Sequence, residues 1–178
     1  MKILPQVIRT EGQNTVCTVD RLSYTGQAPP LTAKEIESLL KKNIIARICT
    51  HNKDGTIHAA PVSCEYRNGQ IVILSYVSSL KTKNIKRNNN VTVLIDTESV
   101  QGVLIYGKAE LGHENVYQLA ISMWEKAFRA PKDKVERLVK AYLDKVKFVV
   151  VRITPQRIVT FDYTKDDVYN SLVKTYLG

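Results

Sequence analysis

The amino-acid sequence predicts a mainly β protein of the α+β class, a six-to-seven-stranded antiparallel β-barrel with flanking helices. Short apolar runs with strand-like alternation repeat through the middle of the 178-residue chain. Glycine-containing turns separate these runs, and helical periodicity is confined to the segments around them. We expect one domain, residues 1–178, because no stretch resembles a linker between two cores.

The composition is that of a globular protein with surplus positive charge. Hydrophobic residues make up 44% of the chain and charged residues 24%, which allows a packed core. The net charge of +9 favours phosphorylated ligands, acidic partners or nucleic acid. Three cysteines lack metal-site spacing and are interpreted as reduced, buried thiols. No apolar run has the length of a membrane span, so we expect a cytoplasmic protein without membrane contact.

Residues 1–31 are expected to form an extended arm, because the second half of this segment is rich in turn formers. A helix should begin directly after the arm. Thr32 and Glu35 have the spacing of a capping box, and Leu31 and Ile36 have that of a hydrophobic staple.

Three consecutive strands should follow the helix as a meander. Strand-like runs cover residues 44–50, 56–66 and 70–76. A polar turn at residues 52–55 joins the first two runs, and Asn68-Gly69, a pair favoured in tight hairpin turns, joins the second two. The sequence therefore predicts two adjacent hairpins.

Four more apolar runs predict the strands that complete the barrel. They cover residues 91–96, 102–111, 148–153 and 157–161, with a turn at Pro155 between the last two.

Helical periodicity returns in three places in the second half of the chain. Apolar residues recur at helical spacing in residues 116–128 and 132–143. The tail, residues 163–178, also has an apolar stripe, and Thr164 with Asp167 has the spacing of a cap. We therefore expect two helices before the last strands and a helical tail after them.

Residues 75–87 carry the strongest chemical signal, because they join a strand end to a basic helix. Hydroxyl side chains come first and lysines second. A helix start offers unpaired backbone N–H groups and a positive dipole end, so it favours an anion such as phosphate. A purely structural interpretation stays open, in which Ser79 caps the helix and the lysines form a solvated face. Neither a Walker loop nor a GxGxxG motif supports nucleotide binding.

Six short motifs follow one another between residues 46 and 111, and residues 148–162 follow them as a predicted closing hairpin. The six motifs are Ala46-Arg47-Ile48-Cys49-Thr50, Asp54-Gly55, His58-Ala59-Ala60-Pro61-Val62, Ser75-x5-Lys81-x2-Asn84-Ile85, Val91-Thr92-Val93-Leu94-Ile95 and Gly107-Lys108-Ala109-Glu110-Leu111. In this order and spacing they resemble the pyridoxamine phosphate oxidase-like FMN-binding split β-barrel family. The resemblance does not extend to the arm or to the tail.

The resemblance implies an FMN site, with a deazaflavin as the alternative cofactor. It assigns the phosphate to Ser75, Ser79 and Lys81, and it lets Arg47 reach the phosphate or ribityl chain. In such barrels the flavin ring lies along strand backbone, in a cleft between the two subunits of a homodimer. The further residues that we expect at the cofactor are Ile48, Thr50, Pro61 and Val62 beside the ring, Tyr76 at the phosphate loop, and Gln101 from the partner subunit.

One cation of the family pattern is missing. The family often has an arginine just before the phosphate-loop lysine, where this chain has Leu80. We expect Lys83 to compensate for this loss.

The resemblance suggests a flavin-dependent oxidoreductase acting on an unknown small molecule. Catalysis would belong to the flavin, because the sequence has no Ser/His/Asp order, paired carboxylates or metal cluster. Residues 163–178 lack arginine, which argues against pyridoxamine phosphate oxidation itself, and the three scattered histidines argue against a haem ligand. Two alternatives stay open, a non-catalytic flavin-binding or storage protein and a basic nucleic-acid-binding barrel. The second lacks aromatic residues for base stacking around its basic loop.

Overall fold

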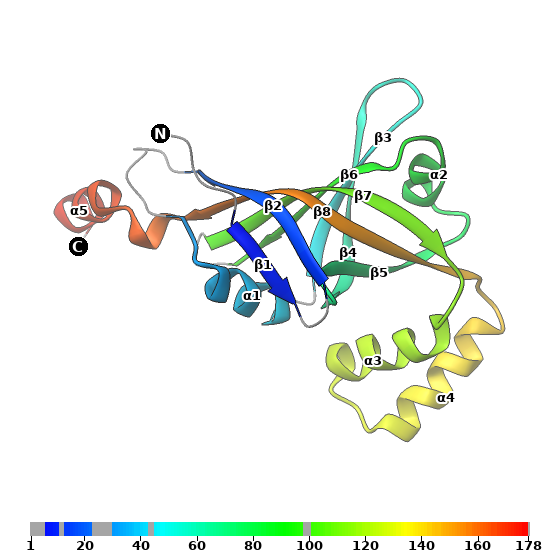
Figure 1. The fold of residues 1–178 in the computed structure, drawn as a ribbon. Helices are drawn as coiled ribbons and strands as arrows, with labels where there is room; N and C mark the ends of the chain where they lie inside the picture. Colours follow the sequence, from blue (N-terminus) through cyan, green and yellow to red (C-terminus); the bar gives the residue numbers. More distant parts are fainter. Residues whose placement is uncertain (1–5, 11–12, 23–29, 43–44, 98–100, 178) are drawn as a thin grey trace.

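Six antiparallel strands with alternating buried and exposed side chains close into a barrel (Figure 1). The computed structural model describes residues 6–10, 13–22, 30–42, 45–97 and 101–177. Around the barrel the strand order is β8-β5-β4-β3-β6-β7, and β7 pairs with β8 to close it. The strands are β3 (Ile45–His51), β4 (Ile57–Arg67), β5 (Gln70–Tyr76), β6 (Asn90–Asp96), β7 (Gln101–Gly112) and β8 (Phe148–Asp162).

The predicted barrel and its meander are confirmed. β3, β4 and β5 pair in succession, and Arg67 faces Gln70 at the end of the second hairpin. Asn68 and Gly69 connect these two residues with φ of 49° and 77°. Both angles lie in the left-handed region that tight hairpin turns require, which explains the Asn-Gly pair.

Branched aliphatic side chains fill the barrel interior. Ile48, Ile73, Val93, Ile105 and Ile153 are fully buried. β-branched residues suit the pleated strand, and each buried side chain of this size contributes about 1.5–3 kcal/mol.

The helix α1 (Ala33–Lys42) packs its apolar stripe against the same core. The predicted capping box is confirmed: Thr32 N donates to Glu35 Oε2 at 2.7 Å, and Glu35 N donates to Thr32 Oγ1 at 3.3 Å. Lys165 Nζ, in the turn just after β8, lies 2.5 Å from Glu35 Oε1. These contacts fix α1 on the barrel.

The predicted turn at Pro155 is wrong, because β8 runs from Phe148 to Asp162 without interruption. The register of β7 against β8 shifts at this point, so that Tyr106 pairs with Arg157 and Gly107 pairs with Pro155. Proline has no N–H for the ladder, and a bulge is one of the places where a strand tolerates it. The strand therefore bends where the sequence suggested that it ends.

Two further strands lie within the expected N-terminal arm. β1 (Gln6–Thr10) and β2 (Gln13–Leu22) form a hairpin, and β2 runs parallel to the second half of β8. β8 thus pairs with β2, β5 and β7. The turn-rich stretch at residues 23–29 lies outside the described residues.

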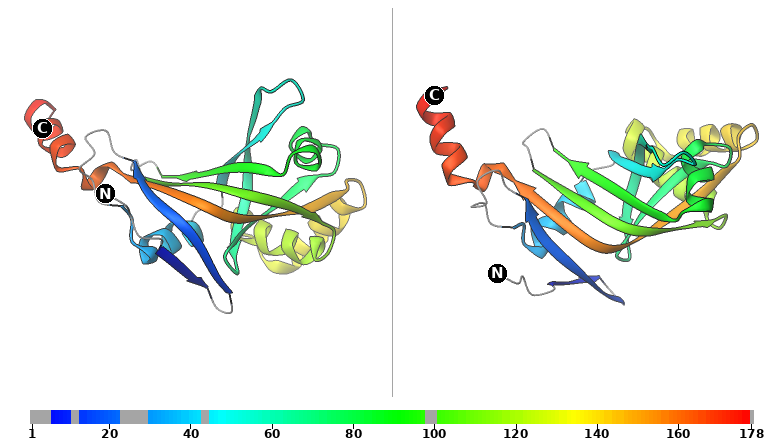
Figure 2. Two further views of the ribbon diagram at one scale, coloured as in Figure 1. Left: turned by 45° about the horizontal axis from the view of Figure 1, so that its top comes forward. Right: turned by 90° about the horizontal axis from the view of Figure 1, so that it is seen from above.

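The helices α3 (Val116–Phe128) and α4 (Lys132–Leu143) form the predicted pair and lie together against one side of the barrel (Figures 1 and 2). Leu119 and Met123 of α3 pack on Val72 of β5 and Val150 of β8. Trp124 adds an edge-to-face contact with Tyr142 of α4, with 5.4 Å between ring centroids. None of the described helices is long and apolar enough to cross a membrane.

The tail contains a short 3-10 turn, η1 (Tyr163–Lys165), and the helix α5 (Asp167–Tyr176). The predicted Thr164 cap is wrong. The Asp166 carboxylate accepts from Tyr169 N at 3.0 Å and caps α5, while Thr164 N donates to Asp162. Figures 1 and 2 show α5 at the opposite end of the molecule from α2 (Leu80–Arg87).

Two of the three cysteines have described side chains, and both are free thiols. Cys64 is buried, and burial raises the pKa of its thiol to about 11. Cys49 is partly exposed on β3. The prediction of buried thiols is therefore confirmed for Cys64 alone.

Candidate functional site

Three hydroxyl groups meet where β5 passes into α2, and we call Ser75, Ser79 and Thr82 the hydroxyl triangle. Ser75 Oγ lies 2.8 Å from Thr82 Oγ1 and 3.0 Å from Ser79 Oγ. Ser79 Oγ donates to Thr82 Oγ1 at 3.0 Å and accepts from Thr82 N at 3.3 Å, which makes Ser79 the N-cap of α2. Thr82 Oγ1 in turn donates to Tyr76 O at 2.9 Å. The structure thus confirms the predicted cap and adds Thr82 to it.

The members of the triangle differ in exposure. Ser75 and Thr82 are buried, at 1% and 0% exposed, whereas Ser79 is partly exposed. Only Ser79 can therefore reach a ligand from outside, and the other two hydroxyls hold it in place.

Lys81 lies half-buried in the first turn of α2, beside the triangle. Burial lowers the pKa of its ammonium group. Among the described residues no carboxylate forms an ion pair with it. Lys83 on the same helix is exposed, and Leu80 is 49% exposed at its first position. A desolvated cation without an acidic partner is a group that an anion would stabilise.

Asn84 anchors α2 to the neighbouring strand. Its side chain is buried and donates to Thr50 Oγ1 at 3.1 Å and to Asn52 Oδ1 at 2.8 Å. Arg87 donates to Asn84 Oδ1 at 3.1 Å and also to the carbonyl oxygen of His51. The end of β3 and the start of α2 are therefore held as one unit.

The predicted ring-binding residues of β3 and β4 divide between the two faces of the barrel wall. Ile48, Thr50 and Val62 are buried and face the interior, so that only their backbone can line an outer site. Pro61 is exposed, and it pairs directly with Arg47, which is also exposed. The outer face alone can present side chains to a ligand here.

Arg47 and Gln101 make their polar contacts outside the hydroxyl triangle. Arg47 forms an ion pair with Asp96 on β6. Gln101 Nε2 donates to Asp162 Oδ2 at 2.9 Å, at the start of β7. Ala109 N near the other end of β7 bonds to Asn89 O just after α2, and eight residues of strand span about 26 Å. The described chain therefore does not bring Gln101 to the triangle.

Tyr76, the last residue of β5, is 39% exposed and adjoins the triangle. Its hydroxyl lies 2.6 Å from that of Tyr142 on α4. This hydrogen bond, with a smaller contribution from burial, raises the pKa of Tyr76. Its ring also packs on Phe148, with 4.8 Å between centroids.

A groove of about 540 Å³ begins at the end of β3 that α2 contacts. Its lining comes from β3, β4, β6, β7 and β8, and includes Cys49, His51, Ile57 and Tyr106. Ile57 is 54% and Tyr106 38% exposed. The volume falls within the range of small-molecule sites.

Sequence reasoning missed the roles of Thr82 and Asn84. Thr82 stands one helical turn after the cap residue Ser79, a spacing that could have placed its hydroxyl at the helix start. The bond from Asn84 to Thr50 joins residues 34 positions apart, and no local pattern signals it.

The closed six-stranded barrel, with the hydroxyl triangle at the N-terminus of α2, defines a split-barrel protein. The family model of pyridoxamine 5'-phosphate oxidase matches residues 32–162, and the chain belongs to this family. No curated protein sequence is significantly similar to the chain.

Solved structures share the fold. A conserved hypothetical protein, Rv2991 from Mycobacterium tuberculosis, is 25% identical, with a TM-score of 0.66 over 76% of this chain and 87% of that one. An F420 reductase is 16% identical, with a TM-score of 0.54 over 68% and 94% of the two chains. A FAD-binding protein from Mesorhizobium loti is 19% identical, with a TM-score of 0.51 over 74% and 93%.

Proposed function

We propose that this protein binds FMN and acts as a flavin-dependent oxidoreductase on a small molecule. The observation that carries the proposal is Lys81, a half-buried cation at the start of α2 that pairs with no carboxylate of the described residues. Two structures with the same fold come from an F420 reductase and a FAD-binding protein, which supports a flavin or a related cofactor. F420 is a deazaflavin and remains the alternative ligand.

The residues at the start of α2 fit a phosphate monoester. The first N–H groups of a helix have no acceptor within the helix, and they carry the positive end of its dipole. Ser79 offers a partly exposed hydroxyl, and Lys81 offers a charge that burial has partly desolvated. Because Asn84 ties α2 to β3, little ordering remains to be done when an anion binds.

The groove beside β3 would hold the rest of the cofactor. It begins at Thr50 and His51, the residues to which α2 is bonded. Its lining combines apolar side chains such as Ile57 with polar ones such as His51 and Gln156, which suits a flat heteroaromatic ring. When bound, a flavin ring supplies reversible hydride acceptance, while the protein orients the ring and limits its contact with water.

We propose further that the working form is a homodimer with the cofactor between subunits. Gln101 lies about 26 Å along β7 from the residue that bonds next to α2, so a second copy would have to supply Gln101. The same outer face carries the exposed side chains of Ile57 and Tyr106. An apolar patch of this kind is typical of an interface.

Replacing Lys81 with alanine should weaken FMN binding about ten- to hundredfold, because one charged contact to phosphate is lost. The measurement is a titration of the apoprotein with FMN, followed by flavin fluorescence. Lys86→Ala is the matched control, since Lys86 is an exposed lysine on the same helix. An unchanged dissociation constant in Lys81→Ala would remove this lysine from the site.

Reduction and reoxidation of the bound flavin distinguish an enzyme from a flavin-storage protein. The protein as purified should show the absorption of oxidised flavin. Nicotinamide or reduced deazaflavin donors should bleach this absorption, and an acceptor should restore it. A bound flavin that none of these donors reduces would contradict the oxidoreductase and leave storage as the function.

Replacing Ile57 with aspartate should convert the dimer to a monomer of 20.1 kDa, because a charge on the apolar outer face opposes burial. Light scattering after gel filtration gives the mass. Leu138→Asp is the control, since Leu138 is 45% exposed on α4, away from this face. If the native chain already has the mass of a monomer, the dimer is wrong.

A further inference from the structure

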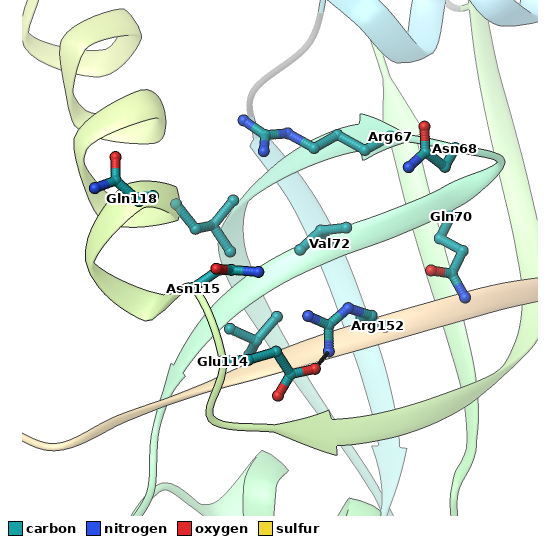
Figure 3. Close-up of a pocket in the computed structure, with 10 residues that line it drawn as sticks. Arg67, Asn68, Gln70, Val72, Glu114, Asn115, Gln118 and Arg152 are labelled. Atoms are coloured by element: carbon teal, nitrogen blue, oxygen red, sulfur yellow. Dashed lines mark ion pairs between the residues drawn. The ribbon is translucent and has the colours of Figure 1, made fainter. Parts of the chain in front are cut away.

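A second cavity lies between the first turn of α3 and the barrel (Figure 3). It has a volume of about 350 Å³. Buried Val72, Leu119 and Val150 form an apolar floor. Around the floor stand two guanidinium groups, one carboxylate and four side-chain amides, from Arg67, Arg152, Glu114, Asn68, Gln70, Asn115 and Gln118.

The cavity already contains a carboxylate-binding arrangement. Arg152 Nη1 lies 2.5 Å from Glu114 Oε1, and the Arg152 side chain is only 27% exposed, whereas that of Glu114 is 58% exposed. Gly112 makes room for the pair, because a Cβ there would lie 2.5 Å from Glu114 Oε2 and 2.8 Å from Arg152 Nη1. Arg152 is thus the fixed member of the pair, and Glu114 is the one that solvent can draw away.

The side-chain amide of Asn115 adds a hydrogen-bond donor that does not cap α3. This residue stands at the N-cap position of α3 with φ of 61°, and its side chain makes no capping bond. Figure 3 shows its amide turned toward the space between Val72 and Arg152. Gln70 is fixed at the opposite wall by a bond from Nε2 to Thr154 Oγ1 at 2.8 Å.

We propose that this cavity binds a small organic monocarboxylate with an apolar body. The ligand's carboxylate takes the place of the Glu114 carboxylate on Arg152 and accepts from the Asn115 amide, while its apolar part rests on Val72 and Leu119. Glu114 swings into solvent as the ligand enters.

The local charge favours a monoanion over a phosphate. Arg67 and Lys126 face Glu65, and Arg152 faces Glu114 and, across the β7–β8 ladder, Glu110. Three cations therefore meet three carboxylates. Exchange of Glu114 for another carboxylate keeps this balance, whereas a dianion would leave an excess negative charge near the partly buried Arg152.

The site is separate from the hydroxyl triangle. Val72 of the cavity floor packs against α3, whereas Ile71 and Ile73 belong to the barrel core. Because side chains alternate along a strand, Ser75 of the triangle lies on the opposite face of β5 from Val72. The proposal therefore does not depend on the bound flavin.

The test is a titration of the full chain with sodium benzoate at constant ionic strength, followed by the NMR signal of the Asn115 side-chain amide. We expect saturable binding that Arg152→Met weakens at least about tenfold and Glu114→Gln strengthens, because the internal competitor is gone. Glu110→Gln is the control: this glutamate also faces Arg152 but does not line the cavity. Lys81→Ala should leave the affinity unchanged.

Several results would overturn the proposal. They are the absence of a saturable response to benzoate, an equal response in Arg152→Met, a gain in Glu110→Gln as large as in Glu114→Gln, and tighter binding of inorganic phosphate than of benzoate. If Arg152→Met does not fold, Glu114→Gln and Glu110→Gln still decide the matter, because only Glu114→Gln is expected to strengthen binding appreciably.

Discussion

The double variant Arg67→Met/Lys126→Met should lose about 3–5 kcal/mol of folding stability, because it leaves a buried carboxylate without a counter-charge. The Glu65 side chain is only 4% exposed. Its Oε1 lies 2.8 Å from Lys126 Nζ and accepts from Ser122 Oγ at 2.7 Å. Its Oε2 forms an ion pair with Arg67 Nε at 2.6 Å that is not a well-aligned hydrogen bond. Chemical denaturation at pH 7 measures the loss.

The pH dependence of this variant should have the opposite sign to that of the wild type. Burial alone would raise the pKa of Glu65, but the bonds from Lys126 and Ser122 and the charge of Arg67 outweigh it and lower the pKa below 4.5. In the wild type this carboxylate therefore stabilises the fold above pH 4.5 and ceases to do so in acid. In the double variant burial dominates, so stability should fall as the pH rises above 4.5.

A third substitution, Glu65→Gln, in the double-variant background is the control. It removes the stranded charge and should recover most of the lost stability. A double variant that unfolds within about 1 kcal/mol of the wild type would show that Glu65 is not the desolvated centre of this cluster.

Gly107→Val is expected to cost about 3 kcal/mol, the upper end of the range for overpacking, because the added atoms meet backbone. A Cβ at Gly107 would lie 2.6 Å from Thr154 O and 2.9 Å from Ile153 Cγ2. Gly107 also sits at the register shift opposite Pro155, on the seam that closes the barrel. The two strands cannot separate here without opening that seam.

Ala59→Val provides the comparison for Gly107→Val. Ala59 is an exposed strand residue of β4, paired with Cys49, where added methyl groups meet solvent. Thermal unfolding of both variants should show a large decrease in midpoint for Gly107→Val and a small change for Ala59→Val. Equal unfolding midpoints for the two variants would mean that the β7–β8 pairing accommodates a larger side chain at Gly107.

The sequence predicted the elements that local chemistry determines. The Asn68-Gly69 turn, the Thr32–Glu35 capping box and the Ser79 cap are each fixed by residues within a few positions, and all three are present. The strands follow from alternation, because one face of each strand is buried in the barrel.

Features that depend on distant residues were beyond local patterns. Pro155 ends a strand by ordinary rules, and only the register of β7 shows that a bulge accommodates it. The Thr164 cap is wrong because two helices follow β8, and each is capped by an aspartate: Asp162 caps η1 and Asp166 caps α5.

The sequence predicted which segment forms the candidate site, but not how its side chains are arranged. Residues 75–87 do gather hydroxyls and lysines at a helix start, yet Ser75 is buried behind Ser79 and Arg47 is paired with Asp96. These outcomes depend on which face of a strand each residue occupies and on which acid lies across the sheet. A single sequence contains no local signal for which acid lies across the sheet.

The position of β8 near the end of the chain determines when the barrel can close during synthesis. This strand pairs with β5 on one side, with β7 on the other and, along its second half, with β2. Until residue 148 and its successors have left the ribosome, β5 and β7 are the open edges of a five-stranded sheet, and the β1–β2 hairpin has no barrel strand to join. Open edges invite pairing with other chains, so the nascent protein is most exposed to aggregation in the interval before its last strand arrives.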